Sequence, residues 1–135
     1  MNTIKIILVD YHSIVRDGLK NILMNLPEIE VVGEAASEIE FYKLLKIIKP
    51  DIVLMDIMSP TMTGITITER LSIEYPAIKV IILTSEIDKE TKLKALKSGA
   101  LAYIPKDIDY DKLIESIKIV NEVNKNIEIS IFENL

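Results

Sequence analysis

The sequence predicts an α/β domain in which helices cover both faces of a parallel sheet, and three observations support this class. Five short apolar runs alternate along the chain with five stretches of helical periodicity. Several of these runs are continuous rather than alternating, which is typical of strands buried on both faces. Regular alternation of strand and helix predicts right-handed crossovers that bring all the strands into one parallel sheet.

The first unit is a strand followed by a long helix. Residues 5–10, Lys5-Ile6-Ile7-Leu8-Val9-Asp10, form a largely apolar run that ends in an acid. From Ser13 onward, apolar residues recur at spacings of three and four until Pro27, which predicts an amphipathic helix that stops at the proline. The apolar positions of this helix are Ile14, Val15, Leu19, Ile22, Leu23 and Leu26.

The second unit is shorter. Residues 30–36 predict a strand, and Ser37 and Glu40 then follow with the spacing of a capping box. In that motif the Ser side chain and the Glu side chain satisfy free N–H groups at the start of a helix. The helix is therefore predicted to begin after Ser37, and Pro50 is predicted to end it. Its inward positions are Phe41, Leu44, Leu45 and Ile48.

The third strand, residues 52–55, is a short apolar run that ends at Asp56. The segment after it is ambiguous, because residues 65–68 alternate and are β-branched, as in a strand. A helix is nonetheless predicted, since apolar residues recur at four-residue steps as far as Pro76. These residues are Ile67, Leu71 and Tyr75.

The fourth unit begins with an apolar run at residues 78–83. The helix after it is predicted to start at a cap, either Ser85 or Asp88, and to stop at Gly99, where a left-handed residue is favoured. Its apolar positions are Leu93 and Leu96.

The fifth unit begins with a short strand at residues 101–104. The last helix is predicted to start at Asp109 or Asp111. Its inward positions are Leu113, Ile114, Ile117, Val120 and Val123.

Length and composition limit the function. The chain has 135 residues, which is the size of one domain, and 16 basic residues against 21 acidic residues give a net charge of −5. A domain that binds nucleic acid by itself is usually basic, so any contact with DNA is expected from a segment outside this chain. The chain has no cysteine, and no apolar run is long enough to cross a membrane. We therefore expect a cytoplasmic protein without a signal peptide.

Four polar residues stand at the ends of predicted strands: Asp10, Asp56, Thr84 and Lys106. Parallel strands end at the same edge of their sheet, and ligands of open α/β sheets bind at that edge. A carboxylate nucleophile, a second acid, a hydroxyl and an ammonium group suit phosphoryl transfer with Mg²⁺. The glycines are scattered and form no phosphate-binding loop, which argues against a flavodoxin-like binder of a nucleotide or another small ligand.

The sequence resembles the receiver domain of two-component response regulators over residues 4 to 124. The motifs behind this resemblance are residues 7–10, residues 53–57 with Pro60, Met62 and Gly64, then Thr84-Ser85, and finally Gly99-Ala100-x-x-Tyr103-x-x-Lys106. Further details, at His12, residues 15–19 and residues 103–107, resemble the NarL/FixJ-type subgroup. The resemblance implies a flavodoxin-like, doubly wound (βα)5 fold with strand order 2-1-3-4-5.

The resemblance also implies a role for each site residue. Asp56 would accept a phosphoryl group, Thr84 would follow that group with its hydroxyl, and Lys106 would contact one of its oxygens. Asp10, Asp56 and the main-chain carbonyl of Met58 would bind Mg²⁺. Tyr103 would be an aromatic switch that moves inward behind Thr84.

Tyr11 departs from the family pattern, which usually has a second acid at this position. A neutral phenol is a poor ligand for a hard divalent cation. We therefore expect weak Mg²⁺ binding and slow or absent phosphorylation. The alternative is a pseudo-receiver that acts as an interaction or dimerisation module without phosphorylation. Ser59, where the family commonly has Met, is a milder departure.

The expected partner is a sensor histidine kinase. The chain would act as a signalling domain rather than an enzyme, and at most it would phosphorylate and dephosphorylate itself. The subgroup usually reaches DNA through a C-terminal helix-turn-helix domain, which this chain does not contain. Residues 1–125 are predicted to form the receiver, and residues 126–135 a tail or the start of a linker. Ile119, an apolar position beyond what the core needs, leaves a homodimer open.

Overall fold

The computed structural model describes residues 2–85 and 88–123. Its elements are β1 (Ile4–Val9), α1 (Ser13–Leu23), β2 (Ile29–Ala35), α2 (Glu38–Leu45), β3 (Ile52–Met55), α3 (Thr63–Glu74), β4 (Lys79–Thr84), α4 (Lys89–Ser98), β5 (Ala102–Pro105) and α5 (Tyr110–Glu122). The predicted alternation of strand and helix is therefore confirmed. The predicted tail, residues 126–135, lies outside the described residues.

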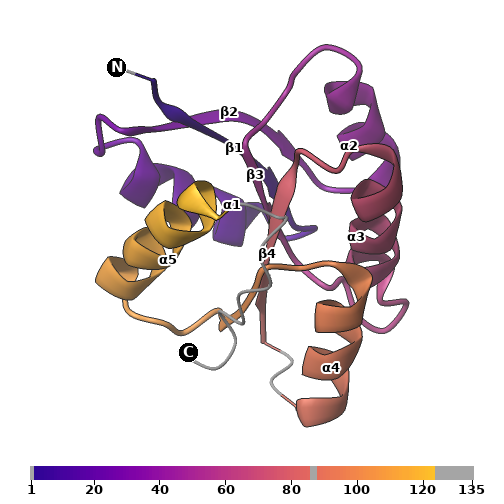
Figure 1. The fold of residues 1–135 in the computed structure, drawn as a ribbon. Helices are drawn as coiled ribbons and strands as arrows, with labels where there is room; N and C mark the ends of the chain where they lie inside the picture. The colour runs from indigo at the N-terminus through magenta and orange to yellow at the C-terminus, as the bar shows by residue number, and fades with distance from the viewer. Residues whose placement is uncertain (1, 86–87, 124–135) are drawn as a thin grey trace.

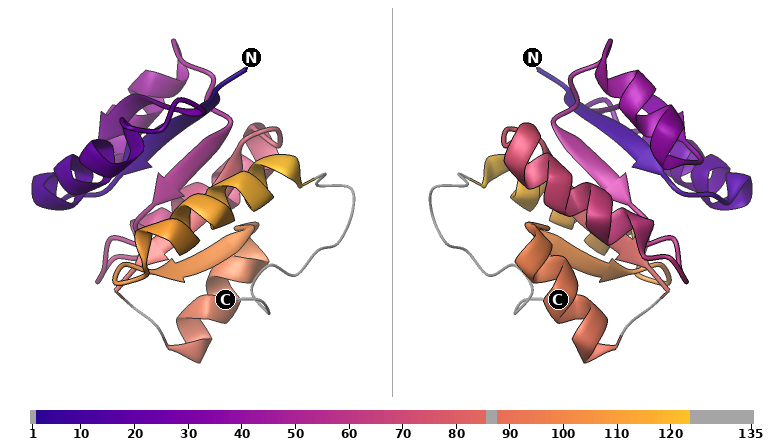
Figure 2. Two further views of the ribbon diagram at one scale, coloured as in Figure 1. Left: turned by 90° about the vertical axis from the view of Figure 1, so that its left-hand side faces the viewer. Right: turned by 90° about the vertical axis from the view of Figure 1, so that its right-hand side faces the viewer.

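The five strands form one parallel sheet with the order β2-β1-β3-β4-β5, as predicted. Helices α1 and α5 cover one face, and α2, α3 and α4 cover the other (Figures 1 and 2). The order reverses between β1 and β3, which are hydrogen-bonded neighbours. All carboxyl ends lie at one edge of the sheet, so the residues after β1, β3, β4 and β5 are neighbours in space.

The strands contribute to two separate cores, because successive side chains of a strand point to opposite faces of the sheet. In β1, Ile7 and Val9 pack with α2 and α3, whereas Ile6 and Leu8 pack with α1 and α5. The largest fully buried side chain in the first core is that of Phe41 of α2. Burial on both sides explains why β1, β3 and β4 have nearly continuous apolar sequences.

The ambiguous segment after β3 is helical. Residues 65–68 lie inside α3, and the Thr68 hydroxyl donates a hydrogen bond of 2.7 Å to the Gly64 carbonyl one turn earlier. Ile67 and Leu71 are both fully buried against the sheet. Packing of this apolar face therefore outweighs the strand preference of the β-branched residues.

The predicted caps are present where the structure describes them. The Glu40 N–H donates to the Ser37 hydroxyl at 3.2 Å, and the Glu40 carboxylate accepts from the Ala36 N–H. Asp88, rather than Ser85, caps α4, since its carboxylate accepts the Thr91 N–H at 2.8 Å. Gly99 ends α4 with a φ of 111°, a left-handed value that favours glycine.

Two helices end earlier than predicted. Helix α1 ends at Leu23 and α2 ends at Leu45, before the prolines that were expected to stop them. In both cases the following residues continue as turns with tighter hydrogen bonds, such as the Ile47 N–H to the Leu44 carbonyl at 3.0 Å. Helix ends commonly satisfy their last carbonyl groups in this way.

The inward positions of α1 and α4 were partly wrong. Ile14 is 85% exposed, because it lies nine residues before the buried Leu23, about half a turn out of phase at roughly 100° per residue. Leu93 and Leu96 are nearly half exposed. The buried face of α4 consists instead of small residues, which are Thr91, Ala95 and Ser98.

None of the helices in the described part of the chain has the length and apolar character that a membrane span requires.

Candidate functional site

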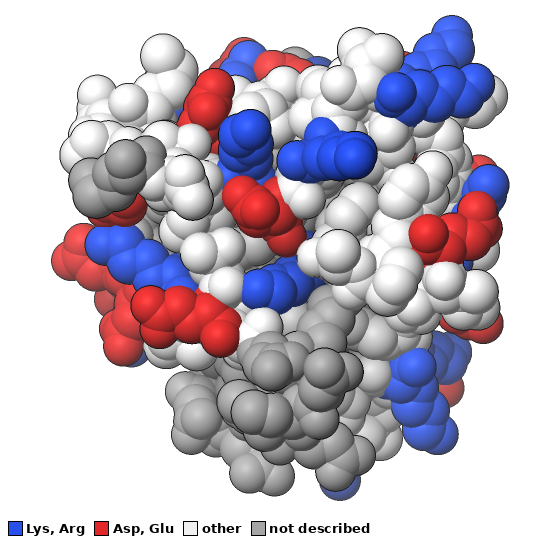
Figure 3. Space-filling model, turned by 45° about the horizontal axis from the view of Figure 1, so that its top comes forward, with Lys and Arg blue, Asp and Glu red and all other residues white. Residues whose placement is uncertain are grey.

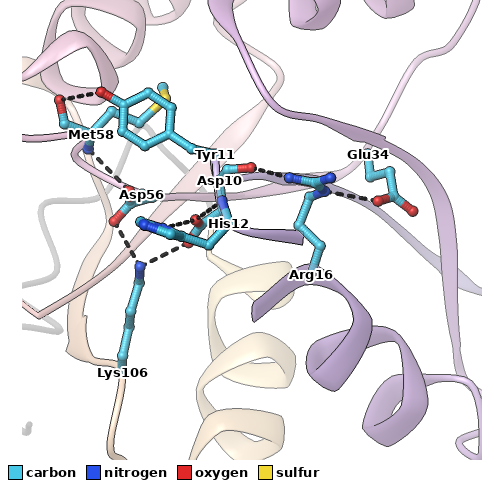
Figure 4. A network of polar contacts seen from close by, with 8 residues as sticks. All are labelled: Asp10, Tyr11, His12, Arg16, Glu34, Asp56, Met58 and Lys106. Carbon is cyan, nitrogen blue, oxygen red and sulfur yellow. Dashed lines mark hydrogen bonds and ion pairs between the residues drawn. The ribbon is translucent and has the colours of Figure 1, made fainter. Parts of the chain in front are cut away.

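Three of the predicted residues meet at the carboxyl edge of the sheet. The Lys106 ammonium lies 2.8 Å from Asp10 Oδ2 and 3.1 Å from Asp56 Oδ1, so it bridges the two carboxylates (Figure 4). Asp10 follows β1, Asp56 follows β3 and Lys106 follows β5. The Asp56 N–H also donates to the Val9 carbonyl at 2.9 Å, which extends the β1–β3 pairing to the site.

The loop between β3 and α3 shapes the position of Asp56. The Met58 N–H donates to Asp56 Oδ2 at 3.2 Å, and Met58 has a left-handed φ of 60°. Gly64 packs directly against this loop, because a Cβ on it would lie only 1.9 Å from the Asp56 carbonyl oxygen. Only glycine therefore allows α3 to begin so close to the backbone of Asp56.

These side chains open into a small pocket of about 90 Å³. Its lining includes Asp56, Met58, Thr84 and Lys106, from three different strand ends, together with Tyr11 and His12 from the loop after β1. The Asp56 side chain is 10% exposed. The pocket thus gives the carboxylate a narrow opening rather than sealing it in the core.

Tyr103 lies outside this pocket. Its side chain is only 6% exposed and packs in the core beneath α2, α3 and α4. On β5 it is paired with Ile82 of β4, two residues before Thr84. The proposed switch residue thus occupies an inward position close to the strand that carries Thr84.

Burial and charge act in opposite directions on the ionisable groups. Burial raises the pKa of Asp56, the negative charge of Asp10 raises it further, and Lys106 offsets part of the rise. Burial on its own disfavours the Lys106 ammonium, but the hydrogen bond to Asp10 and the two carboxylate charges leave its pKa raised overall. With both acids ionised, the cluster carries one net negative charge, which suits a cation.

Each oxygen that could bind a cation already accepts a hydrogen bond. Asp10 Oδ1 accepts the His12 N–H at 2.8 Å and lies 3.0 Å from the His12 ring nitrogen. The Met58 carbonyl accepts three donors: the Tyr11 hydroxyl at 3.5 Å, the Thr61 hydroxyl at 3.0 Å and the Met62 N–H at 3.2 Å. A carbonyl oxygen has only two lone pairs. A metal at this position therefore competes with protein donors.

The donor set nonetheless fits Mg²⁺. Two carboxylates and one carbonyl are hard oxygen ligands, and Mg²⁺ typically uses one or two carboxylates and completes its shell with water and phosphate oxygens. Residues 2–85 and 88–123 contain no cluster of three or more His, Cys, Asp or Glu side chains that could hold a metal. The third acid is missing because position 11 is Tyr.

Sequence reasoning missed three contacts in this region. It used His12 only as a detail of the subgroup resemblance and did not predict its bond to Asp10. It did not predict the Thr61 hydroxyl on the Met58 carbonyl. Arg16 was noted only as part of a motif, yet its guanidinium contacts the Asp10 carbonyl. No spacing rule predicts these contacts, because each depends on how a loop folds back.

Comparisons with known proteins show which family the chain belongs to. The family model described as response regulator receiver domain matches residues 6–118. The chain belongs to the response regulator receiver family. The transcriptional regulatory protein DegU of Brevibacillus brevis is 36% identical over 134 residues, which cover 99% of this chain and 57% of DegU. The response regulator protein VraR of Staphylococcus aureus is 36% identical over 116 residues, which cover 86% of this chain and 56% of VraR.

Solved structures support the same receiver fold. A two-component response regulator of the LuxR family from Aurantimonas sp. SI85-9A1 superposes with a TM-score of 0.81 at 35% identity, covering 89% of this chain and 86% of that one. These relatives are consistent with the NarL/FixJ-type subgroup. The receiver spans a little over half the length of DegU and VraR. What a whole regulator of this kind does is therefore only a proposal for this chain.

Proposed function

We propose that this receiver accepts a phosphoryl group on Asp56 from a sensor histidine kinase. The observation that supports this most directly is the Asp56 carboxylate, which lies at the opening of a small pocket with Lys106 on one oxygen and the Met58 N–H on the other. Both donors hold the carboxylate in one orientation. A fixed, partly desolvated carboxylate beside a cation is the arrangement that phosphoryl transfer to an acid requires.

In the proposed reaction, an Asp56 oxygen attacks the phosphorus of a phosphohistidine. A new P–O bond forms, the P–N bond breaks, and the released imidazole nitrogen takes up a proton. The Lys106 ammonium offsets negative charge on the transferred oxygens, and the Thr84 hydroxyl at the end of β4 donates to one of them. Asp10, Asp56 and the Met58 carbonyl would hold Mg²⁺, whose charge would reduce the repulsion between the carboxylates and the incoming phosphoryl group.

We propose further that Tyr11 makes the transfer slow. Its neutral phenol replaces a charged ligand, and its hydroxyl contacts the carbonyl that would bind the cation. Tyr103, buried next to the strand that carries Thr84, is the proposed switch residue. Movement of Thr84 toward a phosphoryl group would alter the packing around that ring, and with it the surface of α4, β5 and α5.

The proposed output is transcription, through a DNA-binding segment outside residues 1–135. This chain has a net charge of −5, and on the face shown in Figure 3 acidic and basic side chains are interspersed rather than separated into a basic band. Sequence-independent DNA binding depends on clustered positive charge. We propose that the receiver acts in the cytoplasm and is not an enzyme, apart from transfer to and from Asp56.

A second candidate is a pseudo-receiver that works without phosphate, and the bonds already made by each ligand oxygen favour it. Incubation with a small phosphodonor and Mg²⁺, followed by intact mass spectrometry, separates the two candidates. An adduct of one phosphoryl group that is absent from Asp56→Asn supports the proposed function. Asp51→Asn is a matched control, because Asp51 is a surface acid at the opposite edge of the sheet. Absence of an adduct at long incubation supports the pseudo-receiver.

A further inference from the structure

Arg16 is a nearly buried cation that the proposed transfer does not use. It lies on α1, its side chain is only 13% exposed, and it does not line the pocket. Its Nη1 donates to the Asp10 carbonyl at 2.5 Å, and its Nε donates to Glu34 Oε1 at 2.8 Å (Figure 4). One guanidinium thus joins the end of β1 to the end of β2.

The Asp10 carbonyl is the first acceptor beyond the sheet. The last sheet-like bonds of β1 run from the Asp10 N–H to the Ala35 carbonyl, at 3.1 Å, and from the Asp56 N–H to the Val9 carbonyl. After these bonds the chain leaves the sheet and turns into α1. Within the sheet, the N–H groups of a neighbouring strand donate to the carbonyl groups, and buried carbonyl groups require such a donor. At the Asp10 carbonyl this donor is the Arg16 guanidinium.

The orientation of this peptide group affects two neighbours at once. The Asp10 carboxylate accepts the His12 N–H, so a rotation of the turn would move the carboxylate relative to Lys106. The same rotation would move Tyr11, whose hydroxyl reaches the Met58 carbonyl. Both the remaining acid and the phenol that replaces the missing acid therefore depend on the Asp10–Tyr11 peptide.

Glu34 holds Arg16 in place and also pairs with a second cation, Lys20, which serves as a control. Its Oε1 accepts from Arg16, and its Oε2 lies 2.5 Å from the Lys20 ammonium. Lys20 also lies 3.3 Å from Asp17. Within the described residues, the Lys20 ammonium pairs with Glu34 and Asp17 and makes no ion pair with Asp10. Removing Lys20 therefore removes a cation from Glu34 without removing the donor from the Asp10 carbonyl.

We propose that Arg16, anchored by Glu34, is a positioning residue that sets the cation affinity of the acidic site by fixing the Asp10–Tyr11 turn. It never touches the cation or the phosphoryl group and acts only through Asp10 and Tyr11. Outer residues that orient metal ligands typically change metal affinity by about 10- to 100-fold when removed. The cation part of this inference rests on the proposed function, whereas the effect on the turn does not.

The test compares Arg16→Met with Lys20→Met, each of which replaces a cation by an apolar side chain of similar length. The first measurement is hydrogen exchange of the His12 amide in metal-free protein, which reports the bond to Asp10 directly. The second is Mg²⁺ affinity by calorimetry. Arg16→Met is expected to speed His12 exchange and weaken Mg²⁺ binding, each by about tenfold. Lys20→Met is expected to stay within about twofold of the natural sequence, and Arg16→Lys to recover part of the loss.

Both measurements are repeated in a Tyr11→Asp background, where a second acid strengthens cation binding. If the natural sequence binds no Mg²⁺ and takes up no phosphoryl group, the proposed function fails, and this background still decides the role of Arg16. Equal His12 exchange in Arg16→Met and Lys20→Met would overturn the inference. Faster exchange with unchanged Mg²⁺ affinity in the Tyr11→Asp background would overturn it too, because the turn would then not control the site.

Discussion

Replacing Tyr11 by Asp should restore the missing acid and strengthen Mg²⁺ binding. Tyr11 is 46% exposed and its hydroxyl lies 3.5 Å from the Met58 carbonyl, so position 11 reaches the place where a cation would bind. Two unit charges about 4 Å apart are worth about 1 kcal/mol in water, the appropriate limit for an exposed group. A divalent cation doubles this to about 2 kcal/mol, which corresponds to roughly 30-fold in dissociation constant.

The assay is a calorimetric titration of metal-free protein with Mg²⁺. Tyr11→Phe is the matched control, because it removes the hydroxyl on the Met58 carbonyl and adds no charge. We expect this variant to change affinity by less than about threefold, since a hydrogen bond of 3.5 Å is weak. Tyr11→Asp should also shorten the time needed to form the phosphoryl adduct on Asp56.

Two results would refute this reasoning. If Tyr11→Asp binds Mg²⁺ no more tightly than the natural sequence, position 11 does not limit the site. If Tyr11→Phe gives the full gain, the hydroxyl blocks the carbonyl and the missing charge is irrelevant. Thermal unfolding of both variants should be measured alongside, because a third acid beside Asp10 and Asp56 adds repulsion in the absence of metal.

Three further predictions follow from the site. Burial and the charge of Asp10 raise the pKa of Asp56, so stability is lost as pH rises from the ordinary Asp range through that raised pKa. Asp56→Asn should therefore raise Tm by an amount that grows over this pH interval and is constant above it. Lys106→Met leaves two buried carboxylates without their shared cation and should reduce stability at pH 7 by about 1–3 kcal/mol. The loss should be smaller in acid, because the raised pKa of Asp56 lets that carboxylate take up a proton there. A Cβ at Gly64 meets the Asp56 backbone, so Gly64→Ala should cost about 1–3 kcal/mol in chemical denaturation and slow adduct formation. Gly18→Ala, an exposed helix position with no neighbour within 4 Å, should instead stabilise by about 0.5–1 kcal/mol. Equal effects of the two glycine substitutions would contradict the account of the loop.

The sequence determined the order of elements and the convergence of Asp10, Asp56 and Lys106 by itself. Both follow from local rules: apolar runs of strand length, helical periodicity, and the shared edge at which parallel strands end. The helix at residues 65–68 was also predicted, although local preference favours a strand there, because the four-residue spacing extends past the ambiguous segment.

Only the tertiary structure decided which side chains bond to one another at that edge. The positions of Ile14, Leu93 and Leu96 could not be read from apolarity, because the depth of a helix face depends on what packs against it. The same holds for Arg16 on the Asp10 carbonyl and for the three donors on the Met58 carbonyl. These contacts join segments whose spacing in sequence carries no signal, and their geometry is set by the loops that leave the sheet.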